Sequence, residues 1–285
     1  MIDRVLYGVD FGEYQPLALP CLARLREAGC RELVLVHVMN ERRSLREVPD
    51  LLRDDVADCL EKAVQQRMDE WARICSQDGM TVRPLVAEGR MQWIKLCDIA
   101  REEEASLVVL GPRARKDPGS TTYFAMHAGV ASLLILKMAD PSLQEPYGDS
   151  CKGLFARVLL PTDWSECALR AEQQIIELRN AGTEEVILAH VTELGLTEIV
   201  RKEYEAHSQR RLAHSRRTLE EVGLQVRSLL LEGDPSGAIV DAAERENASL
   251  IVMGSTGKSV TEEQRLGSIS ERVALSSGRS VLLVH

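Results

Sequence analysis

The chain carries the same succession of segments twice, and this duplication limits its possible folds more than any other feature. Three segments of the first half return in the same order in the second half, offset by 153, 153 and 143 residues. The pairs are RVLYGVD (4–10) and RVLLPTD (157–163), AGCRELVLVHV (28–38) and AGTEEVILAHV (181–191), and ASLVVLG (105–111) and ASLIVMG (248–254). A repeat of this length and order predicts two homologous domains.

The duplication also suggests where the domains begin and end. A length of 285 residues lies between one large domain and two ordinary ones, so length alone does not choose. We expect one domain over residues 1–139, a linker over 140–154 and a second domain over 155–285. The segment MADPSLQEPYGDSCKG has two prolines, two glycines and weak periodicity, which is typical of a linker.

Within each copy, short apolar runs alternate with longer stretches of helical periodicity. In the second copy the runs are RVLLPTD, EVILAHV, QVRSLLLEG, SLIVMG and SVLLVH. They are nearly continuous in apolar residues, which indicates parallel strands covered on both faces. We therefore predict an α/β fold of two tandem, doubly wound, Rossmann-like domains, each with a five-stranded parallel sheet and about four helices.

The helices of the second copy can be placed from their capping residues and apolar lines. The first has Ser165 as its expected N-cap and Gly182 as its stop, with an apolar line at Ala168, Ala171, Ile175 and Leu178. Three further helices are expected over about 197–222, 234–248 and 268–277.

The last runs of the two copies, SLLILK and SVLLVH, are so apolar that exposed sheet edges are not expected. We expect the two domains to cover these strands by packing as a pseudo-symmetric pair within one chain, and whether two chains associate stays open.

The overall composition argues against several classes of partner. A net charge of -9 opposes nonspecific binding to nucleic acid or to an anionic membrane. The start of the chain lacks the layout of a signal peptide, and no apolar stretch approaches twenty residues. Seven scattered cysteines without a C-x-x-C pair suit reduced thiols. We expect a cytoplasmic protein that binds neither nucleic acid nor membrane.

Candidate site residues of the second copy gather at one edge of the predicted sheet. Asp163, Val191 and Gly254 each end a predicted strand, and ligands of doubly wound sheets bind beyond the carboxyl ends of the strands. Gly267 and Ser268 open the last helix, whose free N–H groups favour an anion. The loop GSTGKSVTEEQRLGS (254–268) is not a P-loop, because Val252 stands where the first glycine is required. Its glycines allow close backbone approach or positive φ, which suits a phosphate site.

These residues resemble the ATP-binding branch of the universal stress protein family. The family signature, G-x-x-G, nine residues and G-[ST], is met by Gly254-Ser255-Thr256-Gly257, residues 258–266 and Gly267-Ser268. The resemblance covers essentially the whole chain as a tandem pair. It implies that Asp163 meets the adenosine part of ATP and that the Val191 backbone contacts adenine. It further implies a divalent ion such as Mg²⁺, held mainly by the phosphates, and a phosphate site formed by Gly254, Ser255, Gly257, Gly267, Ser268 and Ser270.

The first copy departs from this signature. It keeps Asp10, Val38, Gly111 and a Gly119-Ser120 pair, but its loop PRARKDP has seven residues against twelve, and Ala114 replaces the second glycine. A Cβ atom and a shorter loop spoil a close backbone wrap. We therefore predict one ATP per chain, bound by the second domain.

Other interpretations of single residues stay open. Asp163 could simply cap the following helix. His37 and His190 end buried strands, where a histidine is usually structural. His207 and His214 are expected on a solvated face, and no metal site of protein ligands is predicted. Arg210, Arg211, Arg216 and Arg217 alternate with glutamates, as on a surface with ion pairs.

Three functions are compatible with the sequence. The first is a stress-response regulatory protein that binds ATP and hydrolyses it slowly or not at all. The second is an ATP-using enzyme, either a weak ATPase or a ligase, but the S-G-G-x-D-S loop of pyrophosphatase-type ligases is missing. The third is a nucleotide-free scaffold that dimerises and binds other proteins. No catalytic residue is assigned, because no general base is identifiable.

Overall fold

The fold was examined in a computed structural model, which describes residues 2–12, 15–40, 48–49, 52–76, 79–113, 119–137, 153–192, 198–257 and 265–285. The N-terminal half contains β1 (Arg4–Val9), a 3-10 turn (Gln15–Ala18), α1 (Leu19–Arg24), β2 (Glu32–Met39), α3 (Arg53–Cys75), β3 (Thr81–Glu88), α4 (Gln92–Glu102), β4 (Leu107–Arg113), α5 (Gly119–Ala128) and β5 (Ser132–Lys137). The C-terminal half contains β6 (Arg157–Pro161), α7 (Glu166–Leu178), a 3-10 turn (Arg179–Ala181), β7 (Glu185–Thr192), α8 (Glu198–Glu221), β8 (Gln225–Glu232), α9 (Pro235–Arg245), β9 (Leu250–Gly254), α10 (Ser268–Ser276) and β10 (Ser280–Val284). Most of the predicted linker, 140–154, lies outside the described residues.

All described strands form one ten-stranded sheet in the order β3-β2-β1-β4-β5-β10-β9-β6-β7-β8. Within each half the strands are parallel, and β1 and β6 lie where the strand order reverses. The two halves meet where β5 pairs antiparallel with β10, with Leu134 opposite Leu282. Both leucines are buried. The predicted α/β fold is confirmed. The two halves pack together through direct pairing of their apolar last strands, so their sheets are continuous rather than separate.

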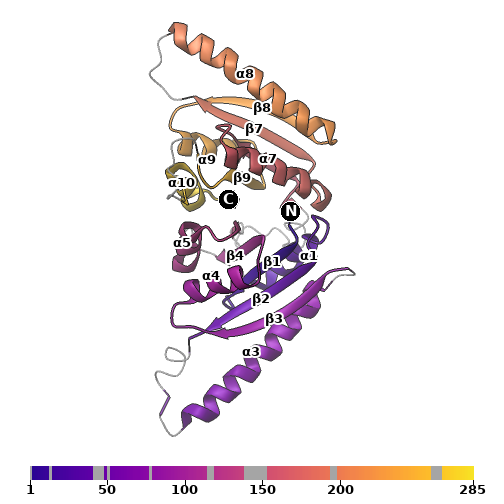
Figure 1. Cartoon of the computed structure of the whole chain (residues 1–285), viewed down its shortest axis with the longest axis vertical. Coiled ribbons are helices and arrows are strands. Elements are labelled where there is room, and N and C mark those ends of the chain that lie inside the picture. The colour runs from indigo at the N-terminus through magenta and orange to yellow at the C-terminus, as the bar shows by residue number, and fades with distance from the viewer. Residues whose placement is uncertain are drawn as a thin grey trace.

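Helices cover both faces of this sheet and form two apolar cores. One core includes residues of α1, α3, α7 and α8, and the other includes residues of α4, α5, α9 and α10. The molecule is elongated, with α3 and α8 at opposite ends and the chain termini near its middle (Figure 1). Among the described helices, none is both long enough and apolar enough to cross a bilayer.

The predicted capping of the second half is confirmed. The Ser165 side chain accepts a hydrogen bond from Ala168 N–H at the start of α7, and Gly182 ends the following turn with a φ of 103°. The expectation that every strand is covered on both faces is wrong for β8, whose residues are half-buried or exposed. β8 is exposed because it is the outermost strand at one edge of the sheet, and β3 is the outermost strand at the other edge.

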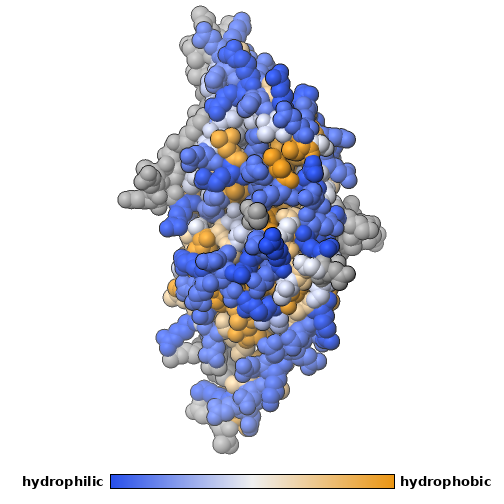
Figure 2. Space-filling view, turned by 45° about the vertical axis from the view of Figure 1, so that its right-hand side comes forward, coloured by the Kyte–Doolittle hydropathy of each residue, from blue (hydrophilic) through white to orange (hydrophobic). Residues whose placement is uncertain are grey.

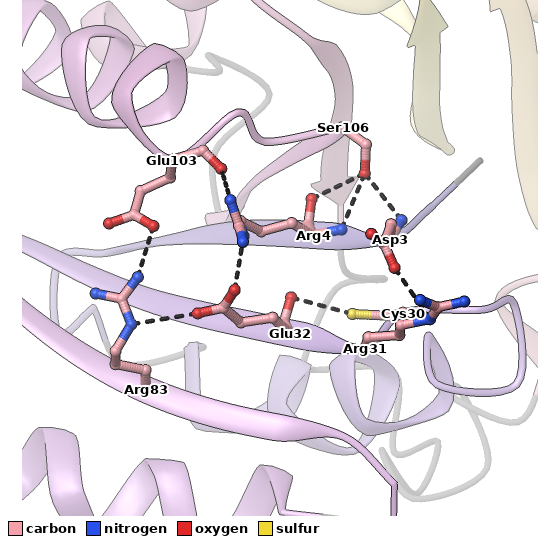
Figure 3. Close-up of polar contacts among 8 residues, drawn as sticks. All are labelled: Asp3, Arg4, Cys30, Arg31, Glu32, Arg83, Glu103 and Ser106. Atoms are coloured by element: carbon pink, nitrogen blue, oxygen red, sulfur yellow. Dashed lines mark hydrogen bonds and ion pairs between the residues drawn. The ribbon is translucent and has the colours of Figure 1, made fainter.

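An arginine–glutamate network at the amino ends of the strands is built twice. In the N-terminal half, Arg4 Nε donates to Glu32 Oε2 at 2.6 Å, and Arg83 bridges Glu32 and Glu103 at 3.3 and 2.6 Å (Figure 3). Partial burial disfavours the charge of Glu32, but the hydrogen bonds from Arg4 and Arg83 outweigh it and lower the pKa of this carboxyl. Arg4 Nη1 also donates to the Glu103 carbonyl, and the same four bonds recur in the C-terminal half among Arg157, Glu185, Arg227 and Glu246.

Polar contacts also cross between the halves beside the β5–β10 pair. Lys137 Nζ donates to the carbonyls of Ala274 and Ser277 at 2.7 and 2.5 Å, at the C-terminus of α10. Burial lowers the pKa of Lys137 to about 8. His285 occupies the matching position after β10, and burial, together with Arg265 and Arg170, lowers its pKa to about 4.

The described cysteines only partly match the expected reduced state. Cys30, Cys59, Cys75, Cys97 and Cys167 are free thiols. Cys21 is disulfide-bonded. The prediction of free thiols throughout is therefore wrong at Cys21, because the spacing of cysteines in the sequence does not show which of them meet in space.

Candidate nucleotide site

The carboxyl ends of β6, β7 and β9 bring most of the predicted site residues together in the C-terminal half. Asp163 lies two residues beyond β6, and its Oδ1 accepts a hydrogen bond from Ser165 N–H at 2.9 Å. The helix cap is Ser165, so Asp163 orders the turn rather than capping α7 itself. Trp164, between them, has a φ of 60°, an uncommon conformation for a bulky residue that recurs at Phe11 with 56°. The strained turn fixes Asp163 at the edge of the sheet.

Gly254 and Gly257 are required for close packing and not for positive φ. A Cβ atom on Gly254 would lie 2.7 Å from Cys167 Cβ and 2.9 Å from Ala168 N. A Cβ atom on Gly257 would lie 2.7 Å from Asp163 Oδ2. Neither residue has a positive φ, so that sequence-based reason for the glycines is wrong, and the close approach seen here is to the protein's own atoms. Gly254 lets β9 pass the first turn of α7, and Gly257 lets the loop pass the carboxylate of Asp163.

Backbone bonds close the described ends of the loop. Ser255 N–H donates to Val284 O at 2.8 Å, and Gly267 N–H donates to Ser255 O at 2.8 Å. The Ser270 hydroxyl is buried and donates to Gly254 O at 2.9 Å. The Ser270 hydroxyl proton is therefore engaged in a bond within the protein, and the side chain holds the start of the loop in place. Residues 258–264, in the middle of the predicted signature, lie outside the described residues.

The loop returns to the sheet at the N-terminus of α10. Gly267 is the N-cap residue, with an extended φ of -83°, and no side chain caps the helix. Ser268, the first residue of α10, is exposed. The first N–H groups of α10 and the positive end of its dipole are thus directed at the space beyond the sheet edge, an arrangement that suits an anion.

The backbone of Val191 faces the same space. Ala189 O accepts from Thr162 N–H at 2.8 Å on the β6 side, and Thr192 O accepts from Gly233 N–H at 3.2 Å on the β8 side. Successive residues of a strand direct their backbone groups to opposite neighbours. Val191 therefore directs its N–H and C=O toward the β6 side, past the last β6–β7 pair, Pro161 and Ala189. This adjacent donor and acceptor can pair with the edge of a planar heterocycle.

A group of stacked side chains beside Asp163 was not predicted from the sequence. The Trp164 and His190 rings lie 4.1 Å apart, and the Arg211 guanidinium lies 4.5 Å from the Trp164 ring. His190 Nδ1 bonds the Thr162 carbonyl at 2.8 Å, so this nitrogen carries the proton, as His37 Nδ1 does toward the Val9 carbonyl. Both histidines are structural, as predicted. Arg211 therefore contacts an aromatic ring as well as belonging to a charged run. The sequence does not predict this contact, because Arg211 and Trp164 are 47 positions apart.

The matching edge of the N-terminal half is occupied by its own side chains. Gln15 is buried and bonds Gly8 O, Asp10 N–H and Phe11 N–H at 3.1, 2.8 and 3.0 Å. Gln92 Nε2 donates to Val38 O at 3.1 Å. By alignment of the halves, the corresponding residues are Ala168 and Pro235, which have no side-chain amide. A pocket of about 50 Å³ remains, bordered by residues that include Asp10, Gln15 and Gln92.

Gly111 in the N-terminal half also differs from Gly254, its sequence counterpart. It has a φ of 94°, and a Cβ atom on it would lie 2.5 Å from Leu136 O. The register of β4 with β5 shifts after Leu110. The end of β4 therefore bends at Gly111, whereas β9 is regular up to Gly254. Most of the following loop, residues 114–118, lies outside the described residues.

Comparison with known proteins gives the family. The sequence matches the universal stress protein family over residues 1–121 and 154–285. The chain belongs to the universal stress protein family. Two relatives from Methanocaldococcus jannaschii, the universal stress proteins MJ0531 and MJ0577, are each 32% identical over 142 and 155 residues, covering 47% and 46% of this chain and 84% and 95% of their own.

A solved structure matches the fold over the full length of this chain. A universal stress protein from Archaeoglobus fulgidus superposes with a TM-score of 0.68 at 21% identity, covering 100% of this chain and 96% of that one. At this identity the likeness shows the fold alone. It is the fold of two tandem universal stress protein domains in one chain.

Among the residues that the structure describes, no group of three or more His, Cys, Asp or Glu is arranged to hold a metal ion.

Proposed function

We propose that the C-terminal half binds ATP and that the protein acts as a nucleotide-dependent regulator, with slow or no hydrolysis. The observation that carries this proposal is the convergence of three features at one sheet edge. These are the α10 N-terminus without a side-chain cap, the Asp163–Gly257 contact and the outward-facing backbone of Val191. A polyanion, a hydroxyl-bearing sugar and a planar base are the three parts of one adenine nucleotide.

Each part of the nucleotide has a partner of suitable chemistry. The Val191 N–H and C=O would pair with the adenine edge, and the Asp163 carboxylate would accept hydrogen bonds from the adenosine moiety. Gly254, Ser255, Gly257, Gly267 and Ser268 would surround the phosphates, with Ser270 supporting Gly254 from below. Mg²⁺ would be held by the phosphates, because it usually keeps several waters and few protein ligands.

The N-terminal half is proposed not to bind ATP. Gln92 already donates to the Val38 carbonyl, the counterpart of the adenine acceptor at Val191. The pocket that remains has about 50 Å³, against about 150 Å³ for a protein cavity that holds benzene. An adenine ring does not fit there without displacement of Gln15 or Gln92.

The first experiment is direct identification of the nucleotide. Freshly purified protein is denatured and its supernatant analysed by mass spectrometry for ATP, ADP and AMP, and the emptied protein is titrated with Mg-ATP by calorimetry. We expect one site per chain. Two equivalent sites, or binding confined to the N-terminal half, would contradict the proposal.

The duplication supplies a matched pair of variants. Asp163→Ala should weaken ATP binding at least tenfold, whereas Asp10→Ala, at the equivalent position, should leave it unchanged. Both aspartates accept a hydrogen bond from the residue two positions later, at 2.9 Å, so the structural cost of each substitution is alike. Equal affinities in the two variants would remove Asp163 from the site.

A nucleotide-free scaffold is the second candidate. It is favoured by the N-terminal edge, where the side chains of Gln15 and Gln92 already bond backbone groups at the ends of the strands. A chain that releases no nucleotide and does not bind Mg-ATP at millimolar concentration would support the scaffold instead.

A further inference from the structure

An aromatic patch lies on the surface of the N-terminal half, on helices α4 and α5. The Trp93 and Phe124 rings are stacked with centroids 4.7 Å apart, and Tyr123 packs edge-on against Phe124. The exposed fractions of Met91, Ile94, Tyr123 and Phe124 are 58%, 40%, 38% and 40%. The face of the molecule in Figure 2 is mainly hydrophilic, with hydrophobic groups spread among the hydrophilic ones. We call Met91, Trp93, Ile94, Tyr123 and Phe124 the aromatic patch.

The C-terminal half shows how the same face looks when it is solvated. When α4 is aligned with α9 from their first residues, and α5 with α10 by their Gly119-Ser120 and Gly267-Ser268 pairs, the patch positions become Asp234, Ser236, Gly237, Glu271 and Arg272. Arg272 pairs there with Asp234 at 3.5 Å, and both side chains are more than half exposed. The fold therefore does not require apolar residues at these positions. The aromatic patch is a property of the N-terminal half alone.

The aromatic patch is continuous with the contact between the two halves. The Tyr123 ring lies 4.7 Å from the His127 ring, and His127 Nε2 lies 3.3 Å from Glu271 Oε1 on α10. Helices α4, α5 and α10 follow one another along one side of the molecule (Figure 1). The border of the patch carries opposite charges on opposite sides, with Lys95 on α4 and Glu271 on α10.

We propose that two copies of the chain associate through the aromatic patch, related by a two-fold axis. A two-fold axis lays each patch on itself, so flat stacked rings meet rings of the same kind. An axis that runs across the direction from α4 to α10 also brings Lys95 of one copy over Glu271 of the other. With about 200 Å² per large side chain, the exposed fractions amount to roughly 350 Å² of apolar surface. That is most of the apolar centre of an interface of about 800 Å² per partner.

The test measures the oligomeric state of the full chain by analytical ultracentrifugation. We expect a dimer at about 100 μM and a monomer at about 1 μM, as for a modest interface. The double variant Tyr123→Glu, Phe124→Arg introduces the residues of the matching C-terminal positions. It should raise the dissociation constant at least tenfold and sediment as a monomer at about 100 μM.

Two further measurements keep the proposal falsifiable. Ile74→Glu alters a residue on α3 that is 55% exposed and lies outside the patch, so its dimerisation should match that of the wild type. Trp71 and Trp164 are buried, so dilution of the wild type should shift the emission of Trp93 to longer wavelength as the dimer separates. A wild type that is monomeric at about 100 μM, or a double variant that dimerises as well as the wild type, would overturn the proposal.

Discussion

The two halves of the molecule share a skeleton and differ in what they place at one edge of it. Both have the strand order 3-2-1-4-5, the same arginine–glutamate network and the same histidine bond to a turn carbonyl. At the carboxyl edge, Gln15 and Gln92 occupy the N-terminal half, whereas Ala168 and Pro235 stand in the C-terminal half. The two halves therefore keep the same side-chain contacts at the amino ends of their strands. They differ in the side chains at the carboxyl ends, where ligands of this fold bind.

The first expected difference between the halves is in nucleotide binding through Gly257. Gly257→Val should weaken ATP binding at least tenfold, about 1.4 kcal/mol or more, because the added side chain meets Asp163 Oδ2, which lies 2.7 Å from the Cβ position. Calorimetry measures the affinity and circular dichroism checks the fold. Gly153→Val is the control, since no atom lies within 4 Å of a Cβ there. Unchanged affinity in the Gly257 variant would refute the assignment of the loop.

The next effect concerns stability at Gly254. Gly254→Ala should lower the free energy of unfolding by about 3 kcal/mol, because overpacking against Cys167 and Ala168 cannot be relieved by moving a flexible side chain. Gly278→Ala, whose nearest neighbour is the Glu244 carboxylate at 3.9 Å, should change it by less than about 1 kcal/mol. Denaturant unfolding distinguishes the two. Equal costs would mean that β9 and α7 adjust to each other.

The third effect is a pH dependence of stability that arises from His285, a residue of the C-terminal half. Burial lowers the pKa of His285 to about 4, below its unfolded value of 6.5. The unfolded chain then binds more protons between these values, so the stability present above pH 6.5 is lost as the pH falls toward 4. At pH 4 this protonation should lower the free energy of unfolding of the wild type by an amount on the order of 2 kcal/mol, and His285→Phe should abolish that decrease. Thermal unfolding at pH 7 and pH 4 measures it, and an unchanged pH dependence in the variant would contradict the burial of this ring.

The smallest effect tests where the halves are alike. Arg83→Met and Arg227→Met each break one arginine–glutamate network, and each should lower the Tm by about 2 °C, since partly exposed ion pairs are weak. High salt should reduce both effects equally. Scanning calorimetry of the two variants that gave clearly unequal shifts would show that the networks are equivalent in geometry but not in energy.

Most of the fold was predictable because its signals are local and repeated. The apolar runs, the Ser165 cap and the Gly182 stop each act within a few residues, and the duplication shows every element twice. The exposure of β8 was not predictable from its residues, because it depends on which strand lies at the edge of the sheet.

The site was predictable only in part. The positions of Asp163 and Gly254 follow from the strands they end, and Gly267 from the helix it begins. The contact of Gly257 with Asp163, the stacking of Arg211 on Trp164 and the bond from Gln92 to Val38 join elements far apart in the sequence. No spacing rule for single elements detects such contacts.

The antiparallel β5–β10 pair has a consequence for how the two sites can differ. In a dimer of identical single domains, every substitution appears on both sides of the contact, and association fails on dilution. Here the partners belong to one polypeptide, so their effective concentration is fixed by the chain and does not fall with the amount of protein. A substitution can therefore alter one side only, which lets a single molecule keep one copy for a ligand and use the other for something else.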